Sequence, residues 1–246
     1  EWTFLQNIIN YQNFRSFAYS NDKLCSNEIK GVVITFNGLG FSAMYSDDDS
    51  FSKELAEKAI INIVPYFNPW SWMNRQTVEL TDELVDVIFK HYNLDGGTSI
   101  VSCGGSMGGL SCLVYAKYAV RTPVSCVANC PVCDLPYHYT ERPDLPRTLY
   151  SAFKGYDGAF EDALKSASPI YLADSMPKIK YYIFHCDRDT CVNKEKHSDR
   201  FVSIMKKAGH CVDYYEVKGR EHCDLSSEMR ELYNQKIYGS ILERGV

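Results

Sequence analysis

The sequence predicts an α/β fold, with a mainly parallel central sheet and helices on both of its faces. Apolar, β-branched runs of strand length alternate with segments whose apolar residues recur at helical spacing. Most connections between them are short. The strand runs are apolar throughout instead of alternating with polar residues, as expected for strands that are covered on both faces.

The predicted elements follow one another from residue 29. The predicted strands are 29–36, 60–67, 96–103, 123–130, 179–186 and 211–219. The predicted helices are 47–59, 76–93, 110–120, 195–209 and 224–244. In the second helix, Leu84, Val85 and Ile88 fall on one face. The long polar stretch 131–177 carries several prolines, and we expect it to form a small cap insertion with short helices beside the sheet.

Length and composition indicate an ordinary globular protein. The chain has 246 residues, of which 45% are hydrophobic and 23% charged, and its formal net charge is −5. This length suits a single domain, 1–246, with a sizeable core. The charge balance does not favour nucleic acid or an anionic membrane surface as a partner. No apolar run approaches the roughly 18 residues of a membrane span.

The ten cysteines include several that stand in apolar, strand-like runs. We expect them to be reduced, buried thiols, because a chain of this size needs no disulfides to stabilise its core. The N-terminus lacks a basic segment followed by an apolar one, which together with the thiols favours a cytoplasmic protein. Cys130 and Cys133 form a C-x-x-C pair without a second pair at zinc-binding spacing or a redox-protein context. We therefore expect no metal and no other cofactor.

The stretch Gly104–Gly108 matches the pattern G-x-S-x-G, with Ser106 at its centre. It lies between a predicted strand and a predicted helix. A serine at a sharp strand-to-helix corner needs small neighbours, and the corner exposes its hydroxyl above the edge of the sheet. Taken alone, the match also fits a flexible turn.

Candidate partners for this serine follow the late strands. A serine nucleophile needs a base, and the base needs an orienting acid. Asp187 and Asp189 come after the strand 179–186, and His222 comes after the strand 211–219. The order Ser, Asp, His is the order expected when the serine stands on a strand-to-helix corner. One aspartate then orients His222, and the other fixes its loop through backbone amides.

The other histidines have weaker claims to a catalytic role. His185 ends a strand, and we expect it to be buried and hydrogen-bonded. His91, His197 and His210 fall near helix ends, where we expect exposure to solvent. His138 lies in the cap stretch, where a contact with substrate is the alternative to a structural role.

An acyl-transfer serine also requires two N–H donors for the oxyanion. One predicted donor is the amide of Met107, directly after the serine. The other comes from the glycine-rich loop after the first predicted strand, where Leu39 is the first choice and Gly40 the second. Trp70 and Trp72 follow the second predicted strand. They either line an acyl pocket as substrate-binding residues or belong to a packing cluster.

In order along the chain, these motifs resemble the α/β-hydrolase superfamily, and within it the prolyl-oligopeptidase-like (S9-like) esterases and peptidases. "NGLG" resembles the oxyanion loop, with Asn37 where the family commonly has histidine. "GGSMGG" resembles the nucleophile elbow, and "GREHCD" occupies the place of the histidine motif. "HCDRDTCV" resembles the end of the acid segment, whose acid stands three residues before a valine. The resemblance therefore implies Asp189, before Val192, and spans about 29–240.

The resemblance implies a serine hydrolase that cleaves a small-molecule carboxylic ester through an acyl-enzyme. Ser106, Asp189 and His222 would be its triad, with Leu39 and Met107 forming the oxyanion hole. Many peptidases of this family carry an N-terminal propeller, and we find none in this sequence, which favours an esterase. Its expected substrates are short-chain or carbohydrate-linked acyl esters. A peptidase or amidase with the same triad is the first alternative. The second alternative is a non-catalytic binding protein on a hydrolase scaffold. The sequence does not indicate an oligomeric state.

Overall fold

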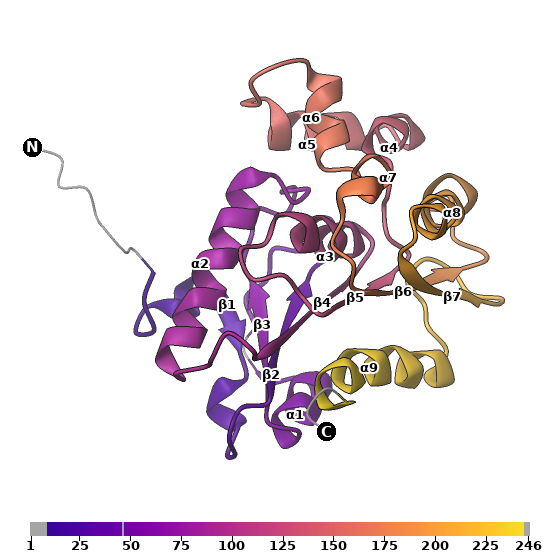
Figure 1. The fold of residues 1–246 in the computed structure, drawn as a ribbon. Coiled ribbons are helices and arrows are strands. Elements are labelled where there is room, and N and C mark those ends of the chain that lie inside the picture. Colours follow the sequence, from indigo (N-terminus) through magenta and orange to yellow (C-terminus); the bar gives the residue numbers. More distant parts are fainter. Residues whose placement is uncertain (1–8, 46, 244–246) are drawn as a thin grey trace, which may run out of the picture.

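The computed structural model describes residues 9–45 and 47–243 (Figure 1). In this part of the chain, seven strands form one sheet in the order β1-β3-β2-β4-β5-β6-β7. The strands are β1 Ala18–Ser20, β2 Gly31–Phe36, β3 Ile60–Pro65, β4 Ser99–Gly105, β5 Ser125–Asn129, β6 Lys180–Cys186 and β7 Cys211–Val217. Neighbouring strands from β3 to β7 are parallel, and β1 pairs antiparallel with β3. The predicted mainly parallel α/β sheet is confirmed.

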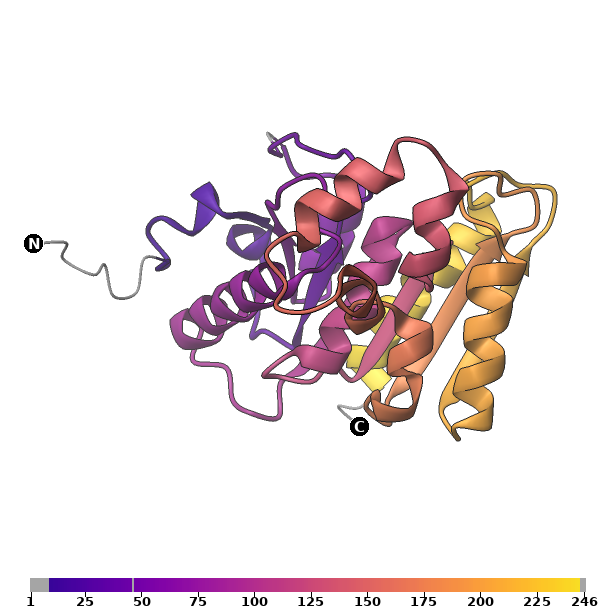
Figure 2. The same cartoon turned by 90° about the horizontal axis from the view of Figure 1, so that it is seen from above.

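Helices connect the strands and cover both faces of the sheet. They are α1 Ser50–Glu57, α2 Arg75–His91, α3 Met107–Tyr118, α4 Leu135–Glu141, α5 Leu145–Phe153, α6 Phe160–Ser166, α7 Pro169–Leu172, α8 Arg200–Lys207 and α9 Ser227–Leu242. The short 3₁₀ turns are η1 Phe14–Ser16, η2 Asp22–Leu24 and η3 Ala173–Ser175, and η4 Glu195–Asp199 is a π-helical turn before α8. Helices α1 and α9 lie on one face of the sheet, and α2, α3 and α8 lie on the other (Figures 1 and 2).

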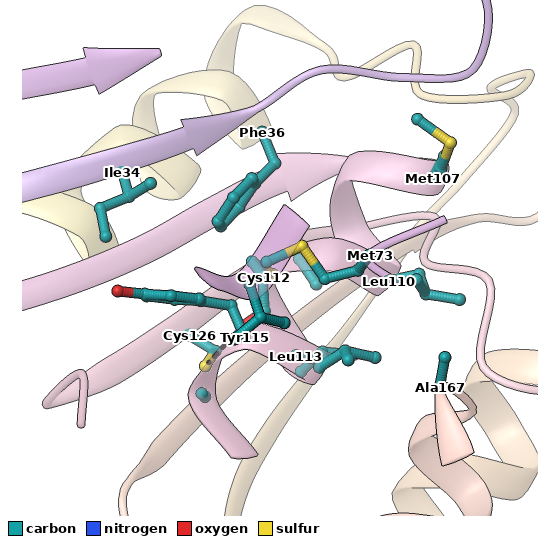
Figure 3. Packing of buried hydrophobic residues seen from close by; sticks show 14 of the residues in the cluster. Ile34, Phe36, Met73, Met107, Leu110, Cys112, Leu113, Tyr115, Cys126 and Ala167 are labelled. Carbon is teal, nitrogen blue, oxygen red and sulfur yellow. Dashed lines mark hydrogen bonds between the residues drawn. The ribbon is translucent and has the colours of Figure 1, made fainter. Parts of the chain in front are cut away.

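Strand β2 shows why the predicted strands are apolar throughout. Val32, Ile34 and Phe36 belong to the larger buried cluster, which also includes residues of α2 and α3. Val33 points to the opposite face and belongs to the second buried cluster, with residues of α1 and α9. The rings of Phe36 and Tyr115 of α3 lie 5.7 Å apart, and Figure 3 shows them within the larger cluster. Both faces of the strand are therefore removed from water, which is the main driving force for this fold.

The 131–177 stretch folds into the short helices α4–α7, as its sequence predicts. Helices α4, α5 and α6 pack on one another, while α7 packs against α3 and α8. In Figure 1 this group of helices stands beyond α3, away from α1 and α9. Leu135, Leu145 and Leu149 join it to the larger buried cluster. We refer to these helices as the cap segment.

Strand β1 is absent from the strands predicted from the sequence. This strand has three residues, which is too short for a repeating pattern to be recognised. The following residue, Asn21, stabilises the edge of the sheet with its buried side chain. Its Oδ1 accepts from the Asn62 amide at 2.7 Å, and its Nδ2 donates to the carbonyls of Ser52 and Ile60. These contacts join residues that are 31 to 41 positions apart, so local sequence carries no sign of them.

All ten cysteines are free thiols in the structure. Six of them are buried: Cys103, Cys126, Cys130 and Cys186 in the predicted strands, and Cys112 and Cys133 outside them. The expected burial is wrong for Cys211, which lies in a predicted strand but is exposed at the start of β7. A helix with the length and apolar character needed to cross a bilayer does not occur in residues 9–45 and 47–243.

Candidate active site

Ser106 stands at the corner between β4 and α3, with φ 59° and ψ −123°. Positive φ is uncommon for residues other than glycine, and such strain persists only where the surrounding structure enforces it. Here the Ser106 amide donates to the carbonyl of Asn129 at 2.9 Å, and the Ser106 carbonyl accepts from the Leu110 amide at 3.1 Å. Hydrogen bonds to β5 and to the first turn of α3 therefore hold the serine in this conformation.

Two glycines make the corner possible. A Cβ on Gly108 would lie 2.1 Å from the carbonyl oxygen of Phe36, and a Cβ on Gly104 would lie 2.5 Å from the carbonyl oxygen of Gly108. Both obstacles are backbone atoms, which cannot rotate away. The glycines thus allow α3 to begin directly against β2, which sets Ser106 at the carboxyl edge of the sheet.

Asp189 and His222 meet across the loops that follow β6 and β7. His222 Nδ1 donates to Asp189 Oδ2 at 2.6 Å. The other carboxylate oxygen, Oδ1, accepts from the amides of Cys191 and Val192 at 2.8 and 2.9 Å. Nε2 of a second histidine, His185, lies 3.3 Å from Asp189 Oδ2. The carboxylate is fully buried, so these donors replace its contacts with water.

These contacts shift the pKa values of the acid and the base in opposite directions. Burial raises the pKa of Asp189, but the hydrogen bonds from His185 and His222 outweigh it, so the pKa lies well below its ordinary value. Burial lowers the pKa of His222, but the hydrogen bond to Asp189 and the nearby Cys130 outweigh this effect and raise the pKa above its ordinary value. The ionised Asp189 therefore favours a protonated His222, the form that a general base assumes after accepting a proton.

Asp187 fixes its loop through hydrogen bonds with the backbone, which is the second of the two roles that the sequence left open. Its Oδ1 accepts from the Gly219 amide at 2.7 Å, and its own amide donates to the carbonyl of Val217. It therefore joins the loop after β6 to the loop after β7. Of the two aspartates, it is Asp189 that contacts His222.

Asn129, at the end of β5, connects the serine corner with the histidine loop. Its carbonyl accepts from the Ser106 amide, and its Nδ2 donates to the carbonyl of Cys223 at 3.2 Å. On the same side, a Cβ built on Gly105 would lie 3.1 Å from Cys223 Sγ. The neighbours of Ser106 and His222 are thus in contact. Asn129 is not among the site residues predicted from the sequence, although a polar residue at the end of an apolar strand is a recognisable signal.

The hydroxyl of Ser106 makes no hydrogen bond to His222 among the described residues. His222 Nε2, the nitrogen that faces away from Asp189, lies instead 3.7 Å from Cys223 Sγ. In ligand-free hydrolytic sites the bond from nucleophile to base is often long and tightens only with substrate. The structure thus brings Asp189 and His222 together directly, and it connects Ser106 with the His222 loop through Asn129 and Cys223.

The loop after β2 lies against the serine, since a Cβ on Gly38 would be 3.9 Å from Ser106 Cβ. The Gly40 amide donates to the carbonyl of Pro69 at 3.0 Å, so it is already engaged. The Leu39 amide has no acceptor within the described part of the chain. Met107 is the first residue of α3, and amides of a first helical turn have no acceptor within their helix. Of the two loop residues, Leu39 is therefore the one with a free donor.

Two hollows adjoin this edge of the sheet. The first is small, about 40 Å³, and is bounded by Gly38, Met107 and the apolar side chains of Phe41, Met44 and Phe67. The second, of about 240 Å³, lies between the loop after β3, the first half of α2 and the cap segment. The residues 66–68 border both hollows. Among the described residues, the side chains that line either hollow include none with a formal charge.

The two tryptophans differ in their surroundings. Trp70 is 36% exposed, borders the second hollow and has the Arg147 guanidinium 5.4 Å from its ring centre. Trp72 is 1% exposed, and its indole N–H donates to Thr148 Oγ1 at 3.1 Å. Its ring also packs edge-on against His138. These contacts favour the packing alternative for Trp72.

The exposure predicted for His197 and His210 is wrong, because both are buried. His197 Nε2 donates to Glu141 Oε2 at 2.8 Å, and His210 Nε2 donates to the carbonyl of Ala173 at 2.8 Å. Glu141 and Ala173 both belong to the 131–177 stretch, which covers these helix ends. His138 is buried as well and bonds to Glu141, in keeping with its structural alternative.

His138, Glu141 and His197 bring three potential metal ligands within 4.8 Å of one another. However, Nδ1 of His197 accepts hydrogen bonds from the amides of Cys133 and Asp134. The ring proton must then be on Nε2, which donates it to Glu141. A metal at Nε2 would require removal of this proton, so the cluster is better described as a hydrogen-bond network.

No protein-family model and no curated protein matches the sequence. Among solved structures, the chain is similar to a puromycin-hydrolysing peptidase of Mycobacterium tuberculosis (TM-score 0.68, 17% identity, 87% of this chain and 35% of that one). It is also similar to an S-formylglutathione hydrolase of Agrobacterium tumefaciens (TM-score 0.68, 15% identity, 89% of this chain and 86% of that one). A third similar structure is esterase B of Lactobacillus rhamnosis (TM-score 0.67, 11% identity, 87% of this chain and 76% of that one).

These similarities establish the α/β-hydrolase fold for the chain, in agreement with its sheet order and its serine corner. The chain spans about a third of the length of the puromycin-hydrolysing peptidase and most of the length of the S-formylglutathione hydrolase and esterase B. At these levels of identity, the activity of the protein has to be argued from its own residues.

Proposed function

We propose that this chain with an α/β-hydrolase fold is a serine hydrolase that cleaves carboxylic esters. Ser106 is the nucleophile, His222 the general base and Asp189 the acid that orients it. The observation that carries the proposal is the 2.6 Å hydrogen bond between Asp189 and His222, made next to a strained serine corner. A surface loop histidine would not require a buried carboxylate with four donors around it.

The proposed reaction has two steps. Ser106 Oγ attacks the ester carbonyl while His222 Nε2 takes its proton, and the ester alcohol leaves with that proton. Water then attacks the acyl-enzyme with His222 again acting as base, and the acid is released. Asp189 remains ionised throughout and stabilises the protonated imidazole.

The amides of Leu39 and Met107 are the proposed donors to the oxyanion. The free state of the Leu39 amide and the engagement of Gly40 by Pro69 support this choice over Gly40. Such preorganised donors stabilise the charge that develops on the carbonyl oxygen, each contributing roughly 10²–10³ in rate. No metal or cofactor is needed for the proposed steps.

The uncharged lining of the two hollows supports an ester with a neutral acyl group. A peptidase that recognises a free N-terminal ammonium needs a carboxylate in its binding site, because burying an unpaired charge is costly. The lining offers amides and hydroxyls instead, together with the apolar Phe41 and Met44 and the exposed Trp70 as a substrate contact. This lining supports short-chain or carbohydrate-linked acyl esters over peptides with a free amino terminus.

The cap segment completes the proposed site within one domain, 1–246. Ser151 and Ala152 of α5 border the second hollow, so the cap segment forms one of its walls. Trp72 and His138 fix this wall to the loop after β3 through their packing contact. The free thiols support a cytoplasmic location for the protein.

A substrate panel tests the proposed activity. We expect p-nitrophenyl acetate and butyrate to be cleaved. The panel also includes methyl ferulate, as an aromatic ester, and alanine p-nitroanilide, as the amide substrate that a peptidase would prefer. Ser106→Ala should lose turnover by several orders of magnitude, because the nucleophile is removed. Faster cleavage of the anilide than of the esters would favour the peptidase, and unchanged hydrolysis by Ser106→Ala would refute the nucleophile.

A further inference from the structure

Three potential ligands for a soft metal ion gather at the candidate active site. A ring nitrogen of His222 and the Sγ atoms of Cys130 and Cys223 all lie within 4.8 Å of one another. His222 Nε2 and Cys223 Sγ are 3.7 Å apart. In a tetrahedral zinc site, with Zn–N about 2.0 Å and Zn–S about 2.3 Å, a nitrogen and a sulfur ligand are separated by about 3.5 Å. The distance between His222 Nε2 and Cys223 Sγ is therefore already close to the distance expected in a zinc site.

The groups around these ligands are those that support a zinc site. His222 Nδ1 donates to Asp189, which fixes the ring and leaves Nε2 available, as in the carboxylate–histidine–zinc arrangement. Cys130 Sγ accepts from the amides of Cys186 and Cys223, each at 3.4 Å. Hydrogen bonds of this kind stabilise the negative charge of a thiolate. The contacts that prepare His222 as a base therefore also prepare it as a metal ligand.

A metal ion can reach this cluster from one side. Cys130 is fully buried, whereas the His222 side chain is 22% exposed and Cys223 is half-buried. The buried thiol would thus be the inner ligand, and the other two would face the solvent. Two sulfurs and an imidazole nitrogen favour Zn²⁺ over hard cations such as Mg²⁺ or Ca²⁺, which prefer oxygen ligands.

We propose that Cys130, His222 and Cys223 form a zinc site whose occupation blocks the candidate active site. On binding, the two thiols become thiolates and His222 gives up any proton that it holds on Nε2, so that this nitrogen can bind the metal; all of these protons pass to the solvent. That nitrogen then has no lone pair to accept a proton from Ser106. Zinc binding itself depends only on the three ligands, whereas the inhibition of hydrolysis rests on the proposed function.

A neighbouring group is the rival for the same ion. Asp189, Cys191 and His222 also bring three ligand atoms within 4.8 Å. The carboxylate in that group already accepts from His222 at Oδ2 and from two backbone amides at Oδ1, so a metal ion on either oxygen would compete with an existing hydrogen bond. The first group keeps these bonds intact, and for this reason we favour it. Cys191 provides the variant that separates the two.

Binding of Co²⁺ and Zn²⁺ to the purified, reduced protein tests the site without any substrate. Co²⁺ bound by two thiolates gives a near-ultraviolet charge-transfer band, which Zn²⁺ should abolish on displacing it. Cys223→Ser and Cys130→Ser should each lose this band and weaken Zn²⁺ binding by at least about tenfold. Ser106→Ala and Cys191→Ser should keep both the Co²⁺ band and the affinity for Zn²⁺. Cys211→Ser should also keep both, because it removes an exposed thiol at the opposite end of β7. Loss of the band in Cys191→Ser, or its retention in Cys223→Ser, would overturn the assignment.

Alkylation of the wild-type protein gives a second measurement that does not depend on a variant folding. Zn²⁺ should protect Cys223 from iodoacetamide and leave Cys211 reactive, as read by peptide mass spectrometry. Equal reactivity of Cys223 with and without Zn²⁺ would contradict the site. If hydrolysis is observed, Zn²⁺ should inhibit it and a chelator should restore it. Protection of Cys223 without inhibition would retain the zinc site and refute the proposed role of His222.

Discussion

Asp189 and His222 share a hydrogen bond of 2.6 Å although 33 positions separate them in the chain. The same carboxylate oxygen lies 3.3 Å from Nε2 of His185, and His185 is fixed in turn by Ser198, whose hydroxyl donates to its Nδ1 at 2.6 Å. Asp189 is therefore held in place from several directions. In our account this rigidity gives His222 one tautomer and one orientation.

Replacing Asp189 with Asn should reduce kcat for p-nitrophenyl butyrate by roughly 10³–10⁴, since an amide cannot hold the imidazole in the required tautomer. The matched control is Asp187→Asn, which changes an acid of the same loop that bonds only to the loop backbone. We expect less than about tenfold loss for the control. A larger loss for Asp187→Asn than for Asp189→Asn would reverse the assignment of the acid.

Gly108→Ala should prevent the corner from forming as observed, because the new Cβ would lie 2.1 Å from the carbonyl oxygen of Phe36. We expect the free energy of unfolding, measured in urea, to fall by about 3 kcal/mol or more. Gly96→Ala is the control, because a Cβ there meets nothing within 4 Å. Its effect should stay within about 1 kcal/mol. Equal stability of the two variants would show that α3 does not depend on this close approach.

Glu141→Gln should destabilise the fold by about 2 kcal/mol, because charge-assisted hydrogen bonds from His138 and His197 are lost. Burial raises the pKa of Glu141, but the two histidines lower it to about 2, below its usual 4.5. The stabilisation is then present above about pH 4.5 and lost as the pH falls towards 2. The difference in urea stability between wild type and variant should shrink over this range. A surface control, Glu161→Gln, removes an exposed pair with Lys165 and should leave stability nearly unchanged.

Trp70→Ala should raise KM for p-nitrophenyl butyrate or methyl ferulate by roughly tenfold if the acyl group enters the second hollow. The matched control is Tyr238→Ala, an aromatic truncation on α9, which lies on the opposite face of the sheet. The control should leave KM unchanged. An unchanged KM in Trp70→Ala for every ester would remove this residue from the proposed substrate site.

The parts of the fold that the sequence predicted are those whose cause is local. The strand before Ser106 and the helix after it are each recognisable from consecutive residues, and the glycines between them indicate a sharp corner. In the sequence, only a family resemblance distinguishes Asp189 from Asp187, since both stand in the same short loop. The physical distinction, a bond to Gly219 for one and to His222 for the other, involves residues about 32 positions away.

What the sequence did not predict depends on distant segments. His197 and His210 are buried because the cap segment covers them, and no property of their own helices indicates this. Asn129 connects the serine corner with a loop 94 residues further along the chain. Strand β1 is recognisable only through its pairing with β3. In each case the deciding contact is tertiary, which local propensity does not encode.

Labelling by a fluorophosphonate, followed by peptide mapping, tests the central claim most directly. The reagent bonds covalently to a serine only when a neighbouring base activates it, so it reports nucleophile and base together. With a chelator present, we predict one modified peptide that carries the label on Ser106, no label in Ser106→Ala and strongly slowed labelling in His222→Gln. Ester hydrolysis without labelling of Ser106, or a label on another serine, would contradict the account.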